Sequence, residues 1–427
     1  MTNRIYILFI LIFFAFIDEA NCQFQFDTYA IHQVDVIDVK NRQIIENQTV
    51  VIEKDIITGV FDSNDYSNID SIQILDFSGH FVVPGLIDAH VHLASNPSKD
   101  DNFEITKNRL DYLLKNGVTS VRDMAGDTRF LNYLSRQASL DEISSPDIYF
   151  SALIAGESFF KDPRTELAAQ GVQVGKAPWM RGINVNSDLS QIIAEAKGTG
   201  ATGLKIYADL DKSYVQRIVR EAHAQKLKVW AHSTVFPARP SEVCQAGVDV
   251  MSHANYLAWE GEKEIPSDAS NRFRKLDRFD ISNSAFQTLM EEMESNQTIL
   301  DAAISVSKRS FPDSTLYNYG VALTKLAYKN NIPIGVGTDL PIDLAATVPI
   351  FQEMISLEED IGMETIDIIR GATIVNAQMI GKENDIGSIE IGKRANLIIL
   401  KNNPIEDINQ IKSISLVIKN GRLINTN

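Results

Sequence analysis

Eight apolar, strand-like runs alternate with helical stretches along the middle of this chain, and this alternation constrains the fold more than any other feature. Helical patterns such as residues 102–117 and 314–331 separate the runs and close on Gly or Asn. Such alternation indicates βα units and a parallel sheet, and eight units predict a (β/α)8 TIM barrel, assigned to residues 84–383. The runs end at His92, Asp123, Leu153, Tyr207, His232, His253, Leu300 and Asp339.

Short β-rich pieces flank this central region on both sides. Residues 23–83 contain such pieces with Asn, Asp and Ser at the turns, and the same texture returns in residues 384–427 with Gly and Asn. We expect the two chain ends to share a sheet. They would form a small composite β-sandwich domain beside the barrel.

The first 22 residues have the layout of a secretory signal peptide. Arg4 precedes an apolar run over residues 5–17, which is too short to span a bilayer, since a spanning helix takes about 20 residues. Ala20 and Cys22 are small residues at the positions that a signal peptidase reads. We therefore expect cleavage after Cys22, no stable membrane insertion, and a periplasmic or secreted protein. Glu19 disfavours a lipoprotein anchored at Cys22, because such signals have an aliphatic residue there.

Composition excludes several classes of protein. With 44% hydrophobic and 22% charged residues, the chain has the balance of a globular protein. The 56 acidic and 40 basic side chains give a net charge of −16, which disfavours nucleic acid as a partner. Only two cysteines occur, Cys22 and Cys244, so neither a disulfide scaffold nor a cysteine-built zinc module is expected. Any metal would be held by His and carboxylate ligands.

Five side chains suited to metal binding lie at the ends of predicted strands. His90 and His92 are two residues apart, so on a strand both imidazoles point to the same side. His232, His253 and Asp339 each close a further apolar run. Imidazole and carboxylate are the ligands expected for zinc or similar dications. Singly, each is more simply a core or turn residue, but five at one end of a barrel favour a metal site.

Lys205 also lies at a predicted strand end. An ammonium group beside two dications would be repelled, so this lysine would be neutral there or point away. A neutral amine can take up carbon dioxide to form a carbamate, which then acts as a carboxylate between two metals. The alternative is an ion pair with a nearby acid such as Asp209.

Several of these residues stand in motifs that carry a family resemblance. The motifs are PGLIDAHVHL, GVTSVRDMAG, GVGTD and the tail TIVNAQMIGKENDIGSIEIGKRANLIIL, together with the strand-end lysine and histidines. In this order they resemble the amidohydrolase superfamily over nearly the whole mature chain. The most similar branch is the imidazolonepropionase-like one with a carboxylated lysine, which includes metal-dependent dipeptidases of the Xaa-Pro type.

The resemblance implies a binuclear site for two divalent ions, with zinc as the first choice. One ion is held by His90, His92 and Asp339, the other by His232 and His253, and a carbamate on Lys205 bridges them. The two ions would share a water and present it as a bridging hydroxide. Asp339 would take its proton and pass it to the leaving nitrogen.

Two further residues are candidates for substrate binding. Arg122 offers forked donors to a substrate carboxylate, and Tyr256 can donate to the carbonyl oxygen. The alternatives are an ion pair of Arg122 with Asp123 and a role of Tyr256 as a rim aromatic. The chain also departs from its branch, because residues 152–165 read ALIAGESFFKDPRT where many relatives have Gly-Gly-His. We expect residues 156–186 to form a long loop over the site.

Three functions remain open for this chain. The first is a hydrolase of carbon–nitrogen bonds acting on a small molecule such as a dipeptide, an acylated amino acid or a cyclic amide. The second is a deaminase. Such an enzyme would need a carboxylate soon after His232, but the chain reads Ser233 and Thr234 there. The third is a non-catalytic barrel scaffold. Loss of candidate metal ligands would favour it, but none of the six is lost. A lactone or ester hydrolase on the same metals, and a homo-oligomer, also stay open.

Overall fold

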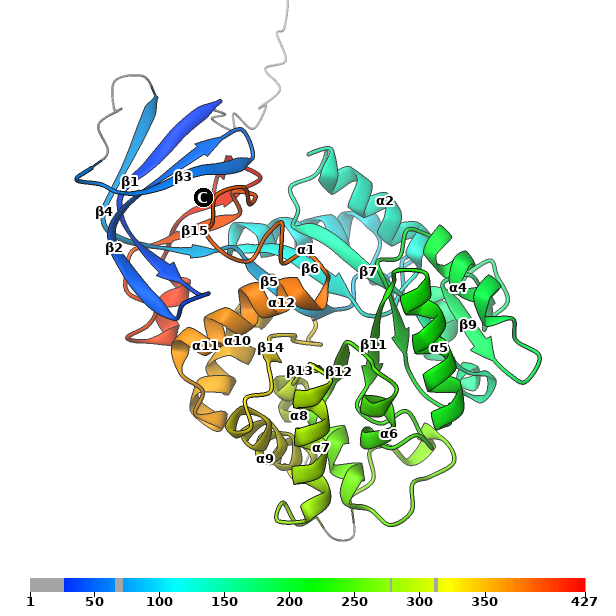
Figure 1. Cartoon of the computed structure of the whole chain (residues 1–427). Coiled ribbons are helices and arrows are strands. Elements are labelled where there is room, and N and C mark those ends of the chain that lie inside the picture. The colour runs from blue at the N-terminus through cyan, green and yellow to red at the C-terminus, as the bar shows by residue number, and fades with distance from the viewer. Residues whose placement is uncertain (1–26, 66–71, 277–278, 311–313, 427) are drawn as a thin grey trace, which may run out of the picture.

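The computed structural model describes residues 27–65, 72–276, 279–310 and 314–426. The predicted signal peptide therefore lies outside the described residues. Two bodies make up the fold (Figure 1), a barrel and a smaller sheet that brings the two ends of the chain together.

Eight parallel strands form the barrel sheet. Neighbouring strands pair in the order β14-β13-β12-β11-β10-β7-β6-β5. Backbone hydrogen bonds from Ala89 N to Val336 O, at 3.1 Å, and from Asp339 N to His90 O, at 2.8 Å, join the first and last strands. The predicted (β/α)8 barrel is thus confirmed. Its strands are β5 (Leu86–Val91), β6 (Val118–Asp123), β7 (Asp147–Gly156), β10 (Gly203–Ile206), β11 (Lys228–His232), β12 (Val250–Ser252), β13 (Ile299–Asp301) and β14 (Ile334–Gly335).

Helices surround the barrel sheet, and their sequences show why they form. In α5 (Lys212–Ala224) the carboxylate of Asp211 caps the first turn by accepting from Ser213 N and Tyr214 N. The buried positions then recur every three or four residues, which is the spacing of one helical face. The other helices are α1 (Phe103–Lys115), α2 (Thr128–Ser139), α3 (Arg164–Ala168), α4 (Leu189–Gly198), α6 (Pro240–Gln245), α7 (Ser284–Ser295), α8 (Ile304–Ser310), α9 (Thr315–Lys329), α10 (Pro349–Ser356), α11 (Thr365–Arg370) and α12 (Asn376–Met379).

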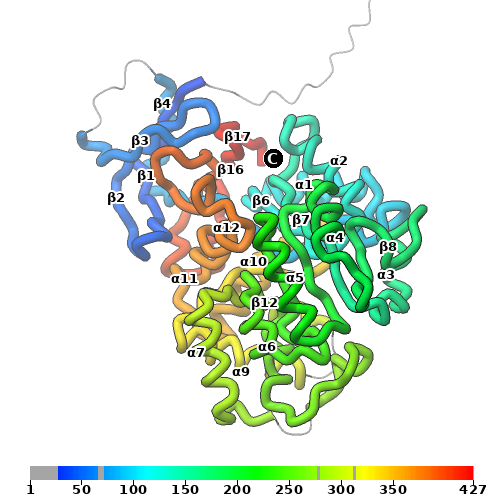
Figure 2. Tube along the Cα trace, turned by 45° about the vertical axis from the view of Figure 1, so that its right-hand side comes forward, coloured from blue at the N-terminus to red at the C-terminus, as the bar shows by residue number. Residues whose placement is uncertain are grey.

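Both chain ends contribute to the second sheet, as predicted. Its order is β17-β16-β15-β4-β1-β2-β3, and β15 pairs antiparallel with β4 through Ile398 and Val83. Figures 1 and 2 show the red C-terminal strands beside the blue N-terminal ones. One hydrogen-bonded path joins all seven strands, and the sheet encloses its own core. The strands are β1 (Thr28–Asp38), β2 (Gln43–Glu53), β3 (Ile56–Asp62), β4 (Gln73–Pro84), β15 (Leu397–Leu400), β16 (Ile414–Lys419) and β17 (Arg422–Ile424).

The segment after β7 is more ordered than the predicted long loop. It contains a 3-10 turn over Glu157–Lys161, the helix α3, and the paired strands β8 (Lys176–Ala177) and β9 (Met180–Ile183). Strand β9 adds to the barrel sheet by pairing in parallel with β7. The segment is thereby fixed beside the carboxyl ends of the strands.

Candidate metal centre

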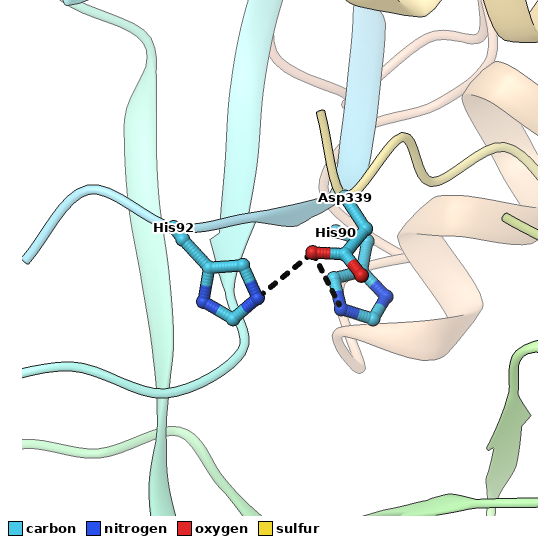
Figure 3. Close-up of side chains that lie close together, drawn as sticks. All are labelled: His90, His92 and Asp339. Carbon is cyan, nitrogen blue, oxygen red and sulfur yellow. Dashed lines mark ion pairs between the residues drawn. The ribbon is translucent and has the colours of Figure 1, made fainter. Parts of the chain in front are cut away.

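His90, His92 and Asp339 form a compact cluster at the carboxyl ends of the first and last barrel strands (Figure 3). One ligand atom from each lies within 4.8 Å of the others. The Oδ1 atom of Asp339 is 3.0 Å from Nε2 of His92 and 3.9 Å from Nε2 of His90. Two imidazoles and a carboxylate that converge in this way can hold a divalent ion.

The other two predicted histidines adjoin this cluster. The ring of His253 lies 5.0 Å from the rings of both His90 and His232, measured between centroids. Nε2 of His253 is 3.8 Å from Oδ2 of Asp339. All four imidazoles therefore surround one small space at the carboxyl face of the barrel.

Two of the candidate ligands have a strained backbone. His253 has φ of 69° and Asp339 has φ of 49°, in the left-handed region that residues other than glycine seldom adopt. Each strained residue is fixed by a backbone hydrogen bond, from His253 N to Asp301 O and from Asp339 N to His90 O. Strain of this kind costs about 1–3 kcal/mol and is concentrated at functional sites. Here it aims both side chains at the cluster.

Asp301 belongs to this centre, although the sequence analysis did not select it. It ends strand β13, is fully buried, and its Oδ2 lies 2.8 Å from Nδ1 of His90. Ser252 and Arg122 donate to the same oxygen at 2.9 and 3.1 Å. A carboxylate on Nδ1 leaves Nε2 of His90 to face the cluster, which is how metal-binding histidines are commonly oriented. The sequence signal was an acid directly after an apolar run.

Lys205 is the second-last residue of β10 and is only 1% exposed. Within the described residues its Nζ has no hydrogen-bond partner. Burial lowers the pKa of Lys205 to about 7, even though the charge of Asp301 opposes this shift. The structure thus gives no support to the alternative pair with Asp209, whose carboxylate accepts from Ser158 Oγ. A buried amine that is partly neutral is suited to carbamate formation.

The buried histidines are held in the state that binds metals. Burial lowers the pKa of His253 to about 3 and that of His232 well below its usual value, and it also lowers the pKa of His90. Burial acts in the same direction on His92, but the hydrogen bond and charge of Asp339 outweigh it and raise the pKa of His92 to about 9. Neutral imidazoles offer free lone pairs, so three of the four need lose no proton to bind a cation.

The residues present fit a centre with two divalent ions. Four imidazoles and one carboxylate supply nitrogen and oxygen donors, and the Nζ of Lys205 is a buried polar atom without a hydrogen-bond partner among the described residues. A carbamate at that position would add a sixth ligand.

The two predicted substrate contacts lie in different surroundings. Arg122 is fully buried in the barrel, where it donates to Ala89 O and Asp301 and stacks on Trp230 at 4.7 Å from the ring centroid. This corrects the expectation that Arg122 contacts substrate, because a side chain enclosed beneath the cluster cannot reach one. Its ion-pair partner is Asp301 rather than Asp123.

Tyr256, by contrast, lies at the cluster. Its ring is 5.4 Å from that of His232 and 5.5 Å from that of His253, between centroids. The ring of Tyr207 also contacts His232, at 4.0 Å between centroids and a tilt of 53°. Burial raises the pKa of both phenols, so both hydroxyls stay protonated and can donate.

A cavity of about 390 Å³ opens beside the cluster. His92 and Asp339 form its polar wall, together with Tyr207. Most of its other lining residues come from β7 and the segment that follows, including Phe159, Arg164 and Met180. A small organic molecule could therefore lie within reach of the metal-binding side chains.

The amidohydrolase family model matches residues 81–424, which is most of the chain. The chain belongs to the amidohydrolase family. It is accordingly a hydrolase that acts on carbon–nitrogen bonds, and members of this family generally use divalent metals.

Relatives of this amidohydrolase are distant. An imidazolonepropionase of Clostridium tetani is 24% identical over 418 residues, covering 91% of this chain and 93% of its own. A 5-methylthioadenosine/S-adenosylhomocysteine deaminase of Thermoanaerobacter pseudethanolicus is 22% identical over 404 residues, covering 87% and 84%. These identities place the chain in an imidazolonepropionase-like group without naming a substrate.

Solved structures support the same architecture. A Xaa-Pro dipeptidase with bound methionine matches with a TM-score of 0.72 and 23% identity, covering 93% of this chain and all of that one. The ochratoxinase of A. niger matches with a TM-score of 0.73 and 19% identity, covering 93% and 95%. At such identities the likeness establishes the fold.

Proposed function

We propose that this amidohydrolase cleaves the amide or peptide-like bond of a small substrate, such as a dipeptide, an acylated amino acid or a cyclic amide. The observation that carries the proposal is the convergence of four imidazoles, Asp339 and the buried Lys205 beside a cavity of about 390 Å³. Two divalent ions, with zinc as the first choice, would bind to His90, His92, His232, His253, Asp339 and a carbamate on Lys205. When bound, they would activate a water and polarise the scissile carbonyl.

The protein's own groups then have separate tasks. The hydrogen bond and charge of His92 keep the pKa of Asp339 well below its usual value despite burial, so this carboxylate is ionised and can accept a proton. It passes that proton to the leaving nitrogen, because an amide nitrogen departs poorly as an anion. Tyr256 donates a hydrogen bond to the carbonyl oxygen as negative charge develops there.

Metal analysis and a substrate panel test this proposal together. We expect elemental analysis to find two divalent ions per chain, and a panel of dipeptides and acylated amino acids to release free amino acids. One ion or none would contradict the binuclear centre. Turnover confined to a lactone panel, or ammonia release from nucleosides, would replace amide hydrolysis by one of the alternative activities. Inactivity on every panel with both ions bound would favour the scaffold.

We also propose that the protein is exported. This rests on the first 22 residues, with their short apolar run and small residues before Gln23. Mass spectrometry of the protein from its native host should give a chain that begins at Gln23. An intact N-terminus, or a lipid on Cys22, would contradict this cleavage. No helix in the described part of the chain is long and apolar enough to cross a membrane.

A further inference from the structure

Two arginines from separate segments approach the substrate cavity. Arg164, the first residue of α3, lines the cavity that also contains His92 and Asp339. Arg272 follows a 3-10 turn over Ala269–Asn271 and lines a second cavity, of about 420 Å³. Phe159 and Asp162 line both cavities, so the two spaces adjoin. The arginines therefore line two adjoining cavities, one of which reaches His92 and Asp339.

Both guanidinium groups lie near the two tyrosine side chains that contact His232. Tyr207 lines the first cavity together with Arg164, and its ring lies 4.6 Å from that of Phe159, which lines both cavities. Arg272 donates a hydrogen bond to the side chain of Tyr256 and also interacts with it through its charge. Arg164 and Tyr207 thus line the first cavity, Arg272 lines the second, and Tyr256 lies beside His232 at 5.4 Å between ring centroids. All four side chains carry donors.

Acidic and carbonyl groups near these arginines occupy only some of their N–H donors. Asp162 accepts from Nε and Nη2 of Arg164 at 3.0 and 2.5 Å, which leaves Nη1 of Arg164 without a protein acceptor among the described residues. Arg272 uses one Nη on Ala269 O, at 2.9 Å. Asp209 and Asp268, which line the second cavity with Lys161, already accept hydrogen bonds from serine and backbone donors. Guanidinium donors therefore remain available to an anion.

Much of the remaining cavity wall is apolar. Leu153, Phe159, Ala168 and Met180 line it, beside the polar residues Ser95 and Thr165. Such a wall favours a substrate with an apolar side chain, because burial of apolar surface is stabilising. An anionic group next to that side chain would meet the donors.

We propose that Arg164 and Arg272, with Tyr207 and Tyr256, bind a free carboxylate of the substrate. This rests on the proposed function and narrows it to N-acyl or N-aminoacyl amino acids with an apolar side chain and a free carboxylate. Arg122, which the sequence indicated for this task, is enclosed in the barrel. Guanidinium is suited to this role because its planar donors match a carboxylate.

The test compares matched ligands that differ only in the carboxylate. N-acetyl-phenylalanine and N-acetyl-phenylalaninamide serve as substrates for the metal-loaded enzyme and as ligands, by calorimetry, for the enzyme in a chelator. We expect the acid to be favoured at least about tenfold in both assays. Arg164→Met and Arg272→Met should each raise KM for the acid about tenfold or more and leave the amide nearly unchanged.

Arg129→Met is the matched control for Arg164→Met. Arg129 makes the same forked pair with the aspartate two residues before it, Asp127, but it stacks on Trp179 and does not line the cavity. We expect this variant to keep the preference for the acid.

The possible outcomes separate this inference from the proposed function. Hydrolysis of acid and amide with equal kcat/KM, or an unchanged preference in both arginine variants, would overturn carboxylate binding while amide hydrolysis stands. The enzyme in chelator could bind the acid selectively while the metal-loaded enzyme turns over neither compound. That result would support the arginine site and overturn the proposed function. Loss of binding in Arg129→Met as well would also overturn the inference, because it would show a general effect of removing a cation.

Discussion

Asp301 accepts a hydrogen bond from Nδ1 of His90 at 2.8 Å inside the barrel, and so fixes which nitrogen of that histidine faces the metal-binding cluster. Both side chains are buried. Ser252 and Arg122 hold the carboxylate in place from two further strands. The orientation of His90 therefore depends on a residue that need not touch the metal.

Replacement of Asp301 by Asn tests this dependence. The amide carries no charge and can present its NH2 group to Nδ1, so His90 loses its fixed orientation. We expect metal affinity to fall 10- to 100-fold, as is typical when such outer partners are lost. Metal retained after dialysis against graded chelator measures the effect. Ser252→Ala removes one donor to the same oxygen and should cost clearly less. Equal metal retention in Asp301→Asn and the wild type would contradict the role.

Lys205 provides a second prediction, with a readout that does not depend on turnover. We expect the wild type in ¹³C-bicarbonate to show a carbamate NMR signal that Lys205→Ala lacks, and this variant to lose metal-dependent turnover with partial rescue by short carboxylic acids. Lys393 is the matched control, because it is also buried but donates to Glu383 O and Ser388 Oγ. Lys393→Ala should keep the signal. A signal that persists in Lys205→Ala would assign the carbamate elsewhere.

The sequence predicted the barrel and much of the cluster because both depend on local pattern. A strand places residues i and i+2 on one side, and a parallel barrel brings all strand ends to one face, so His90, His92 and Asp339 could be grouped without coordinates. Asp301 was missed because the predicted strand stopped one residue earlier, at Leu300. The short strands β8 and β9 were read as loop, since strands of two and four residues exist only through tertiary pairing.

Arg122 shows a different limit of sequence reasoning. A charged residue near a strand end is expected at the open face, yet this side chain turns inward, and the acid that neutralises it, Asp301, is far away in sequence. Pattern along the chain cannot reveal a pair of this kind. The buried pair of Arg122 and Asp301 leads to a prediction about stability rather than about substrate binding.

Arg122→Met should destabilise the protein because it leaves Asp301 buried without its cation. Breaking a buried pair by removing one partner typically costs about 3–5 kcal/mol. Urea unfolding measures the loss, and Arg122→Lys should recover part of it by restoring a charge. Arg164→Met removes an arginine with an exposed side chain and should change stability by no more than about 0.5 kcal/mol. A stable Arg122→Met protein with a raised KM would return Arg122 to the substrate site.

Glu353 on α10 gives a prediction of how stability depends on pH. It is fully buried and accepts from the backbone N–H groups of Ile304 and Ser305, both at 2.9 Å. Burial raises the pKa of Glu353 from 4.5 to about 7, although those hydrogen bonds act in the opposite direction. The native state therefore binds a proton more tightly than the unfolded chain does. The contribution of this group to stability is full below pH 4.5 and is lost as the pH rises toward 7, with an upper bound of roughly 3 kcal/mol.

Replacement of Glu353 by Gln isolates this effect. The variant should lose about 1–3 kcal/mol at low pH, because one backbone N–H no longer meets an acceptor. Its free energy of unfolding in urea should then fall less than that of the wild type between pH 5 and pH 7.5. The cluster titrates in both proteins, so the difference between their slopes reports Glu353 alone. Glu294→Gln, on an exposed face of α7, should keep the wild-type slope. Identical slopes for Glu353→Gln and the wild type would mean that Glu353 is ionised throughout, with its charge held by the two backbone donors.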